Sequence, residues 1–481
     1  MNSGVLINLS EMKLPKPTYD ELFALVQHQS KLIFEQGQTI KRLEKKVAEL
    51  EEKLKLNSKN SSKPPSTDQK GKNDVPKKKG GAKPGHPGHF RPLFSTTQVD
   101  AFVTLRAENC PSCGKTVQPS GEPPSIHQQV EIAPKPYIVT QYNREHFYCP
   151  CCRKYGVAPL PNHVGPSAFG TRLSAFMGFL TGTCRLSRRI ALSILQEGLN
   201  LRAAVGTQSN VENRISAALK LPYEEIEKQV RSSNETKHID ETGWKRWGKR
   251  VFVWVMSTAS GAIYKIQEGR GVKCRDALLG TTATKRVAFV TDRLAIYRFQ
   301  GPHQYCLAHL KRDIKRFAER AGLDGDWGQV MLEYLRTIFE LWRDYREKRK
   351  SRRSFRRTSR QHRDDFEYGL LVASTKGKHS PSLKRFARAL LRKAQNLWVF
   401  ATRDGIEPTN NQAERDLRGI VITRRISYGS KSERGDRFIE RINSVVTTLK
   451  RQGKKCLDYL TGALDAWKTG SSVPTIFSQS C

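Results

Sequence analysis

Apolar positions near the N-terminus recur every seven residues, which predicts a long amphipathic helix over residues 19–57. β-Branched residues dominate one apolar row and leucine the other, as in parallel two-stranded coiled coils. Gln29 and Gln36 interrupt the leucine row. The first row is Val26, Ile33, Ile40, Val47 and Leu54, and the second includes Leu22, Leu43 and Leu50. The pattern favours dimerisation through this helix, with packing on the chain's own domain as the alternative.

Residues 58–94 lose this periodicity and are predicted to form a disordered basic linker. Between positions 58 and 92 the chain has nine Lys or Arg, two Asp, six Pro and five Gly. Such a stretch buries too little apolar surface to order itself. It is either a solvated tether or an arm that becomes ordered when it contacts DNA.

Residues 166–232 return to helical periodicity, with turns expected near Gly182 and Gly206. The part from Leu186 to Leu219 has the length of two short helices joined by a turn, so a DNA-binding helix-turn-helix is one interpretation. Any pair of short helices produces a similar pattern, and that alternative stays open.

Residues 233–322 have the shorter period of strands. Five β-rich runs follow one another, with one helical segment expected at 273–280. This order predicts an antiparallel meander followed by further strands of a mixed sheet. The runs are KHIDE, RVFVWVM, AIYKIQ, KRVAFVTD and QYCLAH.

Helical periodicity resumes over residues 323–402. Apolar residues share one face over 326–345 and again over 383–398. Between these helices lies the basic run 346–363, with ten Lys or Arg and one acidic residue. The stretch EPTNNQAERDLRG follows, in which Asn410 or Asn411 is expected to cap a helix that carries Glu414.

The charge balance indicates a polyanionic partner. The 481 residues include 84 Lys or Arg and 46 Asp or Glu, a formal net charge of +38. Nucleic acid is the first candidate and an anionic membrane surface the second. No run of about 20 apolar residues predicts a membrane span, and no secretory signal is recognised. Ten cysteines in such a chain favour a cytosolic protein with metal-bound or free thiols.

Four cysteines form two C-x-x-C pairs in residues 95–165, here called the cysteine segment. Cys110 and Cys113 belong to CPSCG, and Cys149 and Cys152 belong to CPCC. Two such tight turns supply the four thiolates of a tetrahedral structural Zn²⁺ site. A redox dithiol is the weaker alternative because it leaves the second pair unexplained. Cys151 is expected to be a bystander or a substitute for Cys152.

Three acids, here called the carboxylate site, are candidate ligands for divalent cations. Asp240 and Asp292 each end a buried-strand pattern, which places them where a sheet meets solvent, and Glu414 lies one turn into a helix. Three such acids can hold two divalent cations about 4 Å apart for phosphodiester chemistry. Local roles are alternatives: a turn for Asp240, a helix cap near Leu294 for Asp292, and pairing with Arg418 for Glu414.

A series of motifs extends this reading along most of the chain. After the heptad helix come NSKNSSKPPSTD, GAKPGHPGH, the paired C-x-x-C turns, HIDETGW, TDRLAIY, CLAHLKRD and TNNQAERDLRGIVITRRISYGSKSERG. In this order they resemble the bacterial and archaeal insertion-sequence transposases of family sixty-six, which carry a DDE triad of catalytic acids. The last motif is the most specific, and the ordered set is more specific still.

The resemblance implies an α/β fold class. The expected architecture is a ribonuclease-H-like mixed sheet core with an α-helical insertion, preceded by an N-terminal coiled coil, a basic linker and a small zinc-binding β module. The core would comprise residues 233–322 and 403–470, with 323–402 as the insertion. Asp240, Asp292 and Glu414 match the family's catalytic acids and would bind two Mg²⁺ or Mn²⁺ ions, in addition to the structural Zn²⁺.

The implied function is DNA transposition, with cleavage at the element's ends and joining of the 3′-hydroxyl to target DNA. The partners would be the terminal inverted repeats, target DNA, further copies of the chain in a dimer or larger oligomer, and accessory proteins of the same element, at the nucleoid in a prokaryotic cytoplasm. A catalytically silent DNA-binding regulator and a nuclease that only cuts are the alternatives. Candidate DNA contacts are Arg312, Arg415, Arg418, Arg424 and Arg425.

Three positions depart from the family's pattern, none of them a triad acid, so activity is expected. The departures are Arg293 for a frequent Gly, Leu307 for the Trp of CWAH, and Arg425-Ile426 for Lys-Asn. The first leaves the geometry beside Asp292 open. His309 and Arg312 either pack within the protein or contact DNA.

Overall fold

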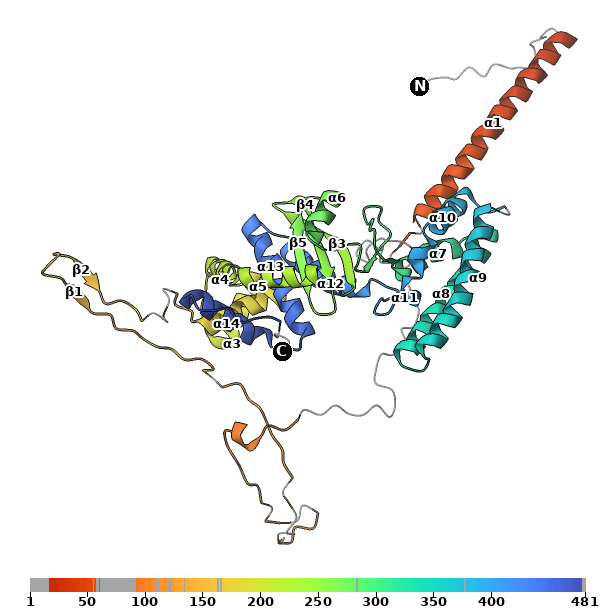
Figure 1. Ribbon diagram of the computed structural model, residues 1–481. Coiled ribbons are helices and arrows are strands. Elements are labelled where there is room, and N and C mark those ends of the chain that lie inside the picture. The colour runs from red at the N-terminus through yellow and green to blue at the C-terminus, as the bar shows by residue number, and fades with distance from the viewer. Residues whose placement is uncertain are drawn as a thin grey trace, which may run out of the picture.

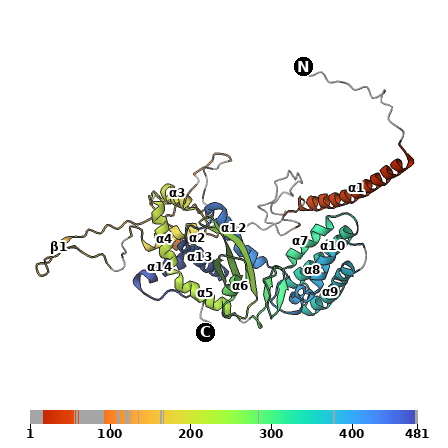
Figure 2. The ribbon, with the colours of Figure 1, turned by 90° about the horizontal axis from the view of Figure 1, so that it is seen from above.

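The protein combines one mixed sheet with many helices (Figures 1 and 2). The structure is a computed structural model that describes residues 17–477 except 55, 58–59, 61–91, 107, 110–111, 117, 119–122, 124, 134, 162–163, 165–166, 283 and 376–377. Most of the predicted basic linker therefore lies outside the described residues, as does Cys110.

The sheet has the spatial order β5-β4-β3-β6-β7. Three strands form an antiparallel meander, and β6 and β7 continue the sheet parallel to β3. The strands are β3 (Lys237–Arg246), β4 (Lys249–Ser257), β5 (Ala262–Gln267), β6 (Phe289–Thr291) and β7 (His303–Tyr305), with α6 (Val272–Leu279) between β5 and β6. The predicted meander, mixed sheet and intervening helix are confirmed.

Alternate residues of β4 enter two different cores, as the period of a strand requires. Phe252, Trp254 and Met256 pack into a core shared with the helices on one side of the sheet. Val251, Val253 and Val255 face the opposite side, where α12 (Asn411–Ser427) covers the sheet. The first core includes residues of α2 (Thr171–Gly182), α3 (Arg188–Leu199), α4 (Val205–Ala218), α5 (Lys220–Ser232), α13 (Glu433–Arg451) and α14 (Cys456–Thr469).

The edge strand β5 is protected by polar side chains of α13. Three backbone N–H groups of β5 donate to acceptors spaced four residues apart along that helix. The pairs are Ala262 with Thr448 Oγ1 at 3.3 Å, Tyr264 with Ser444 Oγ at 3.0 Å and Ile266 with Glu440 Oε1 at 2.6 Å. An edge satisfied in this way offers no template for pairing with another chain.

The helical region after β7 packs around a second hydrophobic core, in which Met331, Leu335 and Phe355 are fully buried and to which Val290 of β6 and Tyr305 of β7 also contribute. Figure 1 shows it beside the β7 side of the sheet. Its elements are α7 (Leu307–Ala318), α8 (Leu323–Arg346), α9 (Arg352–Thr375), α10 (Pro381–Leu391), η4 (Ala394–Leu397) and α11 (Val399–Thr402). The helix predicted over 383–398 is therefore interrupted after Leu391, and most of the basic run belongs to α9.

The N-terminal helix α1 (Tyr19–Leu54) extends away from the rest of the structure (Figure 1). Its apolar rows are exposed in the single chain: Ile33 is 68% and Val26 58% accessible. None of the helices in the described part of the chain is both long and apolar enough to cross a bilayer.

The predicted pair of helices between Leu186 and Leu219 is present as α3 and α4. Asn200 ends α3 in the left-handed conformation, which reverses the chain before α4 begins. One face of α4 is buried against neighbouring helices, while Ile190 and Ile194 of α3 are exposed. DNA binding by this pair stays a prediction.

Candidate active site

Asp240 and Asp292 lie at the same level of two neighbouring parallel strands, but only Asp292 follows the end of its strand. The register pairs Lys237 with Phe289 and His238 with Val290, and each acid lies two residues beyond the last of these pairs. Asp240 lies within β3, paired with Val255 of β4, because β3 continues along β4 beyond the point where β6 stops. The prediction that Asp240 ends a strand is therefore wrong, yet the matched register still brings the two carboxylates to the end of the sheet where β6 stops.

Glu414 reaches this end of the sheet because Asn410 attaches the start of α12 to β3. The Asn410 side-chain amide donates to the Ile239 carbonyl at 2.8 Å, and its backbone N–H donates to the Cys306 sulfur at 3.2 Å. Its side-chain oxygen lies 3.3 Å from His238 Nδ1. Asn410 is fully buried, so the first turn of α12 is held beside Asp240.

The prediction that an asparagine side chain caps this helix is wrong. Asn410 occupies the N-cap position, but its side chain makes no capping hydrogen bond. A buried backbone carbonyl without a donor costs about 1–3 kcal/mol. The side chain satisfies the carbonyl of Ile239 instead of the helix's own N–H groups.

The three acids share a largely buried region in which their negative charges repel one another. Burial raises the pKa of Asp240 well above its usual range, and Glu241, Asp292 and Glu414 raise it further. Burial also raises the pKa of Asp292 and that of Glu414, although Arg312 and Arg418 act in the opposite direction on Glu414. An uncompensated cluster of this kind is chemically suited to divalent cations.

The three carboxylates do not converge on a single point. Among the described residues the one group of three potential ligands within 4.8 Å of one another is Cys306, His309 and Glu414. Glu414 Oε1 lies 3.5 Å from His309 Nδ1.

Sequence reasoning overlooked Glu241, which is a fourth carboxylate beside Asp240. Tyr297 donates a hydrogen bond to Glu241, and Arg270 donates two. The charge of Glu241 contributes to the raised pKa values of Asp240 and Asp292. Its position directly after Asp240 was the available signal, but alternation along a strand places neighbours on opposite faces and argued against it.

Arg293, which departs from the family pattern, is accommodated without backbone strain. It is absent from the residues with positive φ. Its guanidinium pairs with Asp313 of α7 and lies 5.4 Å from the ring centre of Phe386 in α10. The side chain therefore joins the sheet to the helical region.

The five candidate DNA-contacting arginines fall into two groups. Arg415, Arg418 and Arg425 are exposed on α12. Arg424 instead donates to the Gly243 carbonyl of β3, and Arg312 is partly buried close to Glu414. Arg424 and Arg312 therefore lie against other parts of the protein, whereas the other three arginines are exposed.

Both halves of the predicted zinc site form local turns in the cysteine segment. A bridge between Asn109 and Thr116 closes the first, in which Gly114 has a φ of +73°. In the second, β1 (His146–Tyr148) and β2 (Tyr155–Val157) pair, and the Cys149 N–H donates to the Lys154 carbonyl at 2.9 Å.

Hydrogen bonds in the second turn act on one of its thiols. Hydrogen bonds from Cys152 and from the backbone of Cys151 lower the pKa of the Cys149 thiol. Cys113 forms no three-ligand group with Cys149 and Cys152 within the part of the chain that the structure describes. The structure forms the two turns separately, and the Zn²⁺ site stays a prediction.

Comparison with known families identifies this sheet and its helices. The family described as "Transposase IS66 family" matches residues 187–437, which include Asp240, Asp292 and Glu414. A family of unknown function (DUF6444) matches residues 13–92. None of the curated proteins compared with the chain matches it. The chain belongs to the Transposase IS66 family, so it has the role of a transposase, a class of protein that binds DNA.

Proposed function

We propose that the protein is a DDE-type DNA transposase that cleaves the ends of its insertion sequence and joins them to target DNA. Asp240, Asp292 and Glu414 are its catalytic acids. The observation that supports this most is their placement: two neighbouring parallel strands and one helix bring the three acids to one end of the sheet. The family match gives the reaction its substrate, DNA.

The sheet topology supports a ribonuclease-H-like core. A meander of three antiparallel strands continues into two strands parallel to the first, with α12 packed across β3 and β4. In this proposal residues 233–322 and 403–470 form the core and residues 323–402 are inserted into it. A second hydrophobic core, formed mainly by the inserted helices and shared with Val290 of β6 and Tyr305 of β7, supports that division.

The residues of the carboxylate site fit a pair of hard divalent cations. Oxygen ligands suit Mg²⁺ and Mn²⁺, and the pKa of Asp240 is raised by burial first and then by the charges of Glu241, Asp292 and Glu414. When bound, two such ions would activate the attacking oxygen and stabilise the leaving oxygen of a phosphodiester. Asp240, Asp292 and Glu414 would hold these ions.

The protein's own residues then align DNA for two displacements. In the first, water attacks the phosphodiester at the element's end, and a 3′-hydroxyl leaves. In the second, that hydroxyl forms a bond to a target phosphorus, the target's P–O3′ bond breaks, and its oxygen departs with a proton. The helix attachment made by Asn410 would keep Glu414 in register with the strand acids throughout both steps.

Exposed basic surfaces would hold the DNA backbone. Arg415, Arg418 and Arg425 are exposed on α12, the helix that carries Glu414. The helix α9 adds the exposed Arg353, Arg357 and Arg360. Phosphate contacts of this kind position DNA without reading its sequence. If six or more phosphates are neutralised, affinity falls on the order of 10³-fold or more between about 50 and 200 mM salt.

Other parts of the chain would assemble and anchor the complex. The exposed apolar rows of α1 support a coiled-coil dimer, and the two cysteine turns support a structural Zn²⁺ site. The α3–α4 pair and the basic linker are candidate DNA-binding elements. Accessory proteins of the same element, larger oligomers and a nucleoid location in the cytoplasm belong to the same proposal.

A joining assay tests the function. The full chain is mixed with pre-cleaved element ends, Mg²⁺ or Mn²⁺, and a target plasmid. Joined products are expected for the wild type. Hydrolysis without joining would instead identify a nuclease, and binding without either reaction would identify a DNA-binding regulator.

A further inference from the structure

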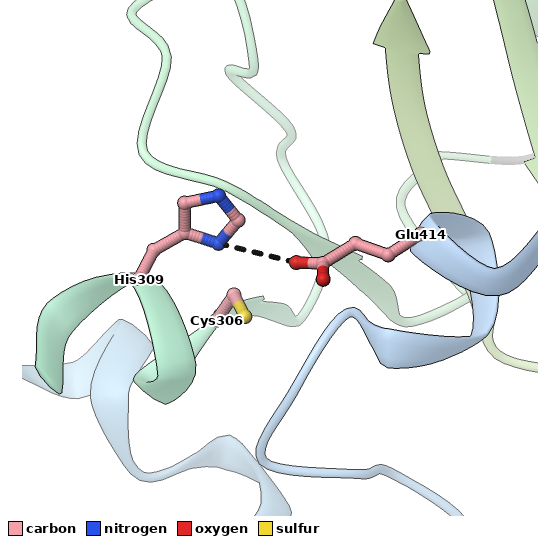
Figure 3. Close-up of side chains that lie close together, drawn as sticks. All are labelled: Cys306, His309 and Glu414. Carbon is pink, nitrogen blue, oxygen red and sulfur yellow. Dashed lines mark ion pairs between the residues drawn. The ribbon is translucent and has the colours of Figure 1, made fainter. Parts of the chain in front are cut away.

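One side-chain cluster beside the carboxylate site contains ligands that Mg²⁺ does not favour. Cys306 is the N-cap residue of α7, His309 lies in the first turn of that helix, and Glu414 comes from α12. Their sulfur, nitrogen and oxygen atoms all lie within 4.8 Å of one another. Figure 3 shows the three side chains converging from these two elements.

Local structure explains why these three residues meet. Residues three apart in a helix lie on one face, so Cys306 and His309 point to the same side of the start of α7. The Asn410 N–H donates to the Cys306 sulfur, and the Glu414 N–H donates to the Asn410 carbonyl at 3.1 Å. Asn410 therefore connects the thiol directly to the turn that carries the carboxylate.

The cluster contains two polar atoms that the described residues leave without a hydrogen bond. His309 Nδ1 and Glu414 Oε1 are both buried, and although they lie only 3.5 Å apart they do not form one with each other. A polar atom buried in this way costs about 1–3 kcal/mol. An ion bound between these two atoms would satisfy both of them.

We propose that Cys306, His309 and Glu414 form a binding site for a late first-row divalent ion, Zn²⁺ above all. One sulfur, one nitrogen and one oxygen ligand match the preferences of Zn²⁺ and leave its fourth tetrahedral position open. Mg²⁺ takes oxygen ligands and is disfavoured by thiolate and imidazole. The site is separate from the four-cysteine site predicted in the cysteine segment.

Charge balance is favourable despite the neighbouring arginines. Zn²⁺ binds cysteine as the thiolate and releases its proton, so the Cys306 thiolate, the Glu414 carboxylate and the ion sum to zero charge. The sulfur is fully buried, while His309 and Glu414 keep 17% and 32% of their side chains accessible, which leaves an entry path.

Metal content and a cobalt spectrum of the full chain without DNA test this site. In excess Mg²⁺, wild type is expected to bind one equivalent of Zn²⁺ more than Cys306→Ser does, in addition to the equivalent proposed for the cysteine segment. Co²⁺ loaded in place of Zn²⁺ should show a thiolate-to-cobalt absorption that the same substitution reduces by the contribution of one sulfur ligand. Cys184→Ser, which changes an exposed cysteine, is the matched control and should alter neither measurement.

A second variant covers the case in which Cys306→Ser fails to fold. His309→Asn changes a partly exposed residue and should weaken binding by more than the roughly 10–100-fold typical of outer-shell partners. Cys149→Ser should retain this equivalent, which separates it from the cysteine segment. Unchanged zinc content and cobalt absorption in folded Cys306→Ser or His309→Asn overturn the proposal, whether or not the protein joins DNA.

Discussion

The carboxylate site and the cysteine segment differ in how much of their geometry the fold provides. Asp240, Asp292 and Glu414 are separated by up to 174 positions in sequence yet lie at one end of a buried sheet. Within the described part of the cysteine segment, by contrast, Cys113 lies in one local turn and Cys149 and Cys152 in another, and these three do not form a ligand group. A packed core can hold repelling charges in place, whereas short exposed turns need an ion to join them.

The largest expected effect separates the two regions by their dependence on Zn²⁺. Removing Zn²⁺ with a chelator, or substituting Cys149→Ser, should open the cysteine segment to proteolysis and leave residues 237–427 resistant. Structural Zn²⁺ contributes on the order of 10 kcal/mol to small modules, so the contrast should be large. Limited proteolysis with mass mapping measures it.

Cys151→Ser is the control for that experiment, because Cys151 is the expected bystander. It should leave the protected fragments unchanged. Identical cleavage patterns with and without chelator would show that the cysteine segment holds its structure without an ion.

The next effect concerns catalysis. Asp240→Asn should reduce strand joining by at least about 10³-fold, since metal-ion catalysis supplies several kcal/mol of transition-state stabilisation. Joined product per unit time, measured at saturating Mg²⁺, is the readout. Joining at the wild-type rate would remove Asp240 from the active site.

The same substitution should have the opposite effect on stability. Because the pKa of Asp240 is raised in the folded state, the folded chain holds its proton more tightly than the unfolded chain. Stability therefore falls as pH rises from the ordinary value of 3.8 towards the folded value. In metal-free buffer at neutral pH, Asp240→Asn should have a higher Tm than the wild type.

Glu440→Gln is a matched control for this pair of measurements. Burial raises the pKa of Glu440 to about 7, but the residue lies at the β5 edge and outside the carboxylate site. It should raise stability at pH 8, where the buried carboxylate is charged, and leave strand joining unchanged. A lower Tm for both variants would contradict the conclusion that these buried carboxylates destabilise the fold when they are charged.

A smaller effect tests how the fold holds Glu414. Asn410→Ala removes the donor to the Ile239 carbonyl and should cost about 1–3 kcal/mol in the free energy of unfolding. Strand joining should fall as well. Asn411→Ala changes an exposed neighbour in the same helix and should have little effect on either. Denaturant titration of the two variants decides the matter, and equal stabilities would contradict the role of Asn410.

The smallest effect distinguishes arginines that face DNA from those that hold the fold. Arg415→Ala should reduce the slope of log affinity against log salt by about 1, as expected for one lost phosphate contact. Arg424→Ala should leave that slope unchanged and lower stability, because Arg424 donates to the backbone of β3. Reversed outcomes would exchange the two assignments.

Sequence patterns predicted the elements better than the contacts between them. The strand runs and the helix at 273–280 were recognisable because alternation and helical periodicity are local. The position of Asn410 as the N-cap was also predictable, but its side-chain partner was not, because Ile239 lies 171 positions away. Long-range partners of this kind follow from packing and leave no local pattern.

The candidate site shows the same limit. Asp292 could be placed at a strand end, but Asp240 lies within β3, because β3 continues along β4 beyond the point where β6 stops. The approach of Glu414 to His309 depends on how α7 and α12 meet. The C-x-x-H spacing of Cys306 and His309 was a visible signal, and only the third ligand, from a distant helix, turns it into a cluster. Glu241 was not expected at the site, because neighbouring residues of a regular strand point to opposite faces of the sheet.

Crystals of the full chain with element-end DNA and Mn²⁺, measured for anomalous scattering of manganese, test the central claim most directly. The expected result is two manganese peaks at the end of the sheet where β6 stops, held by Asp240, Asp292 and Glu414. Manganese bound elsewhere, or bound without Asp240, would contradict it.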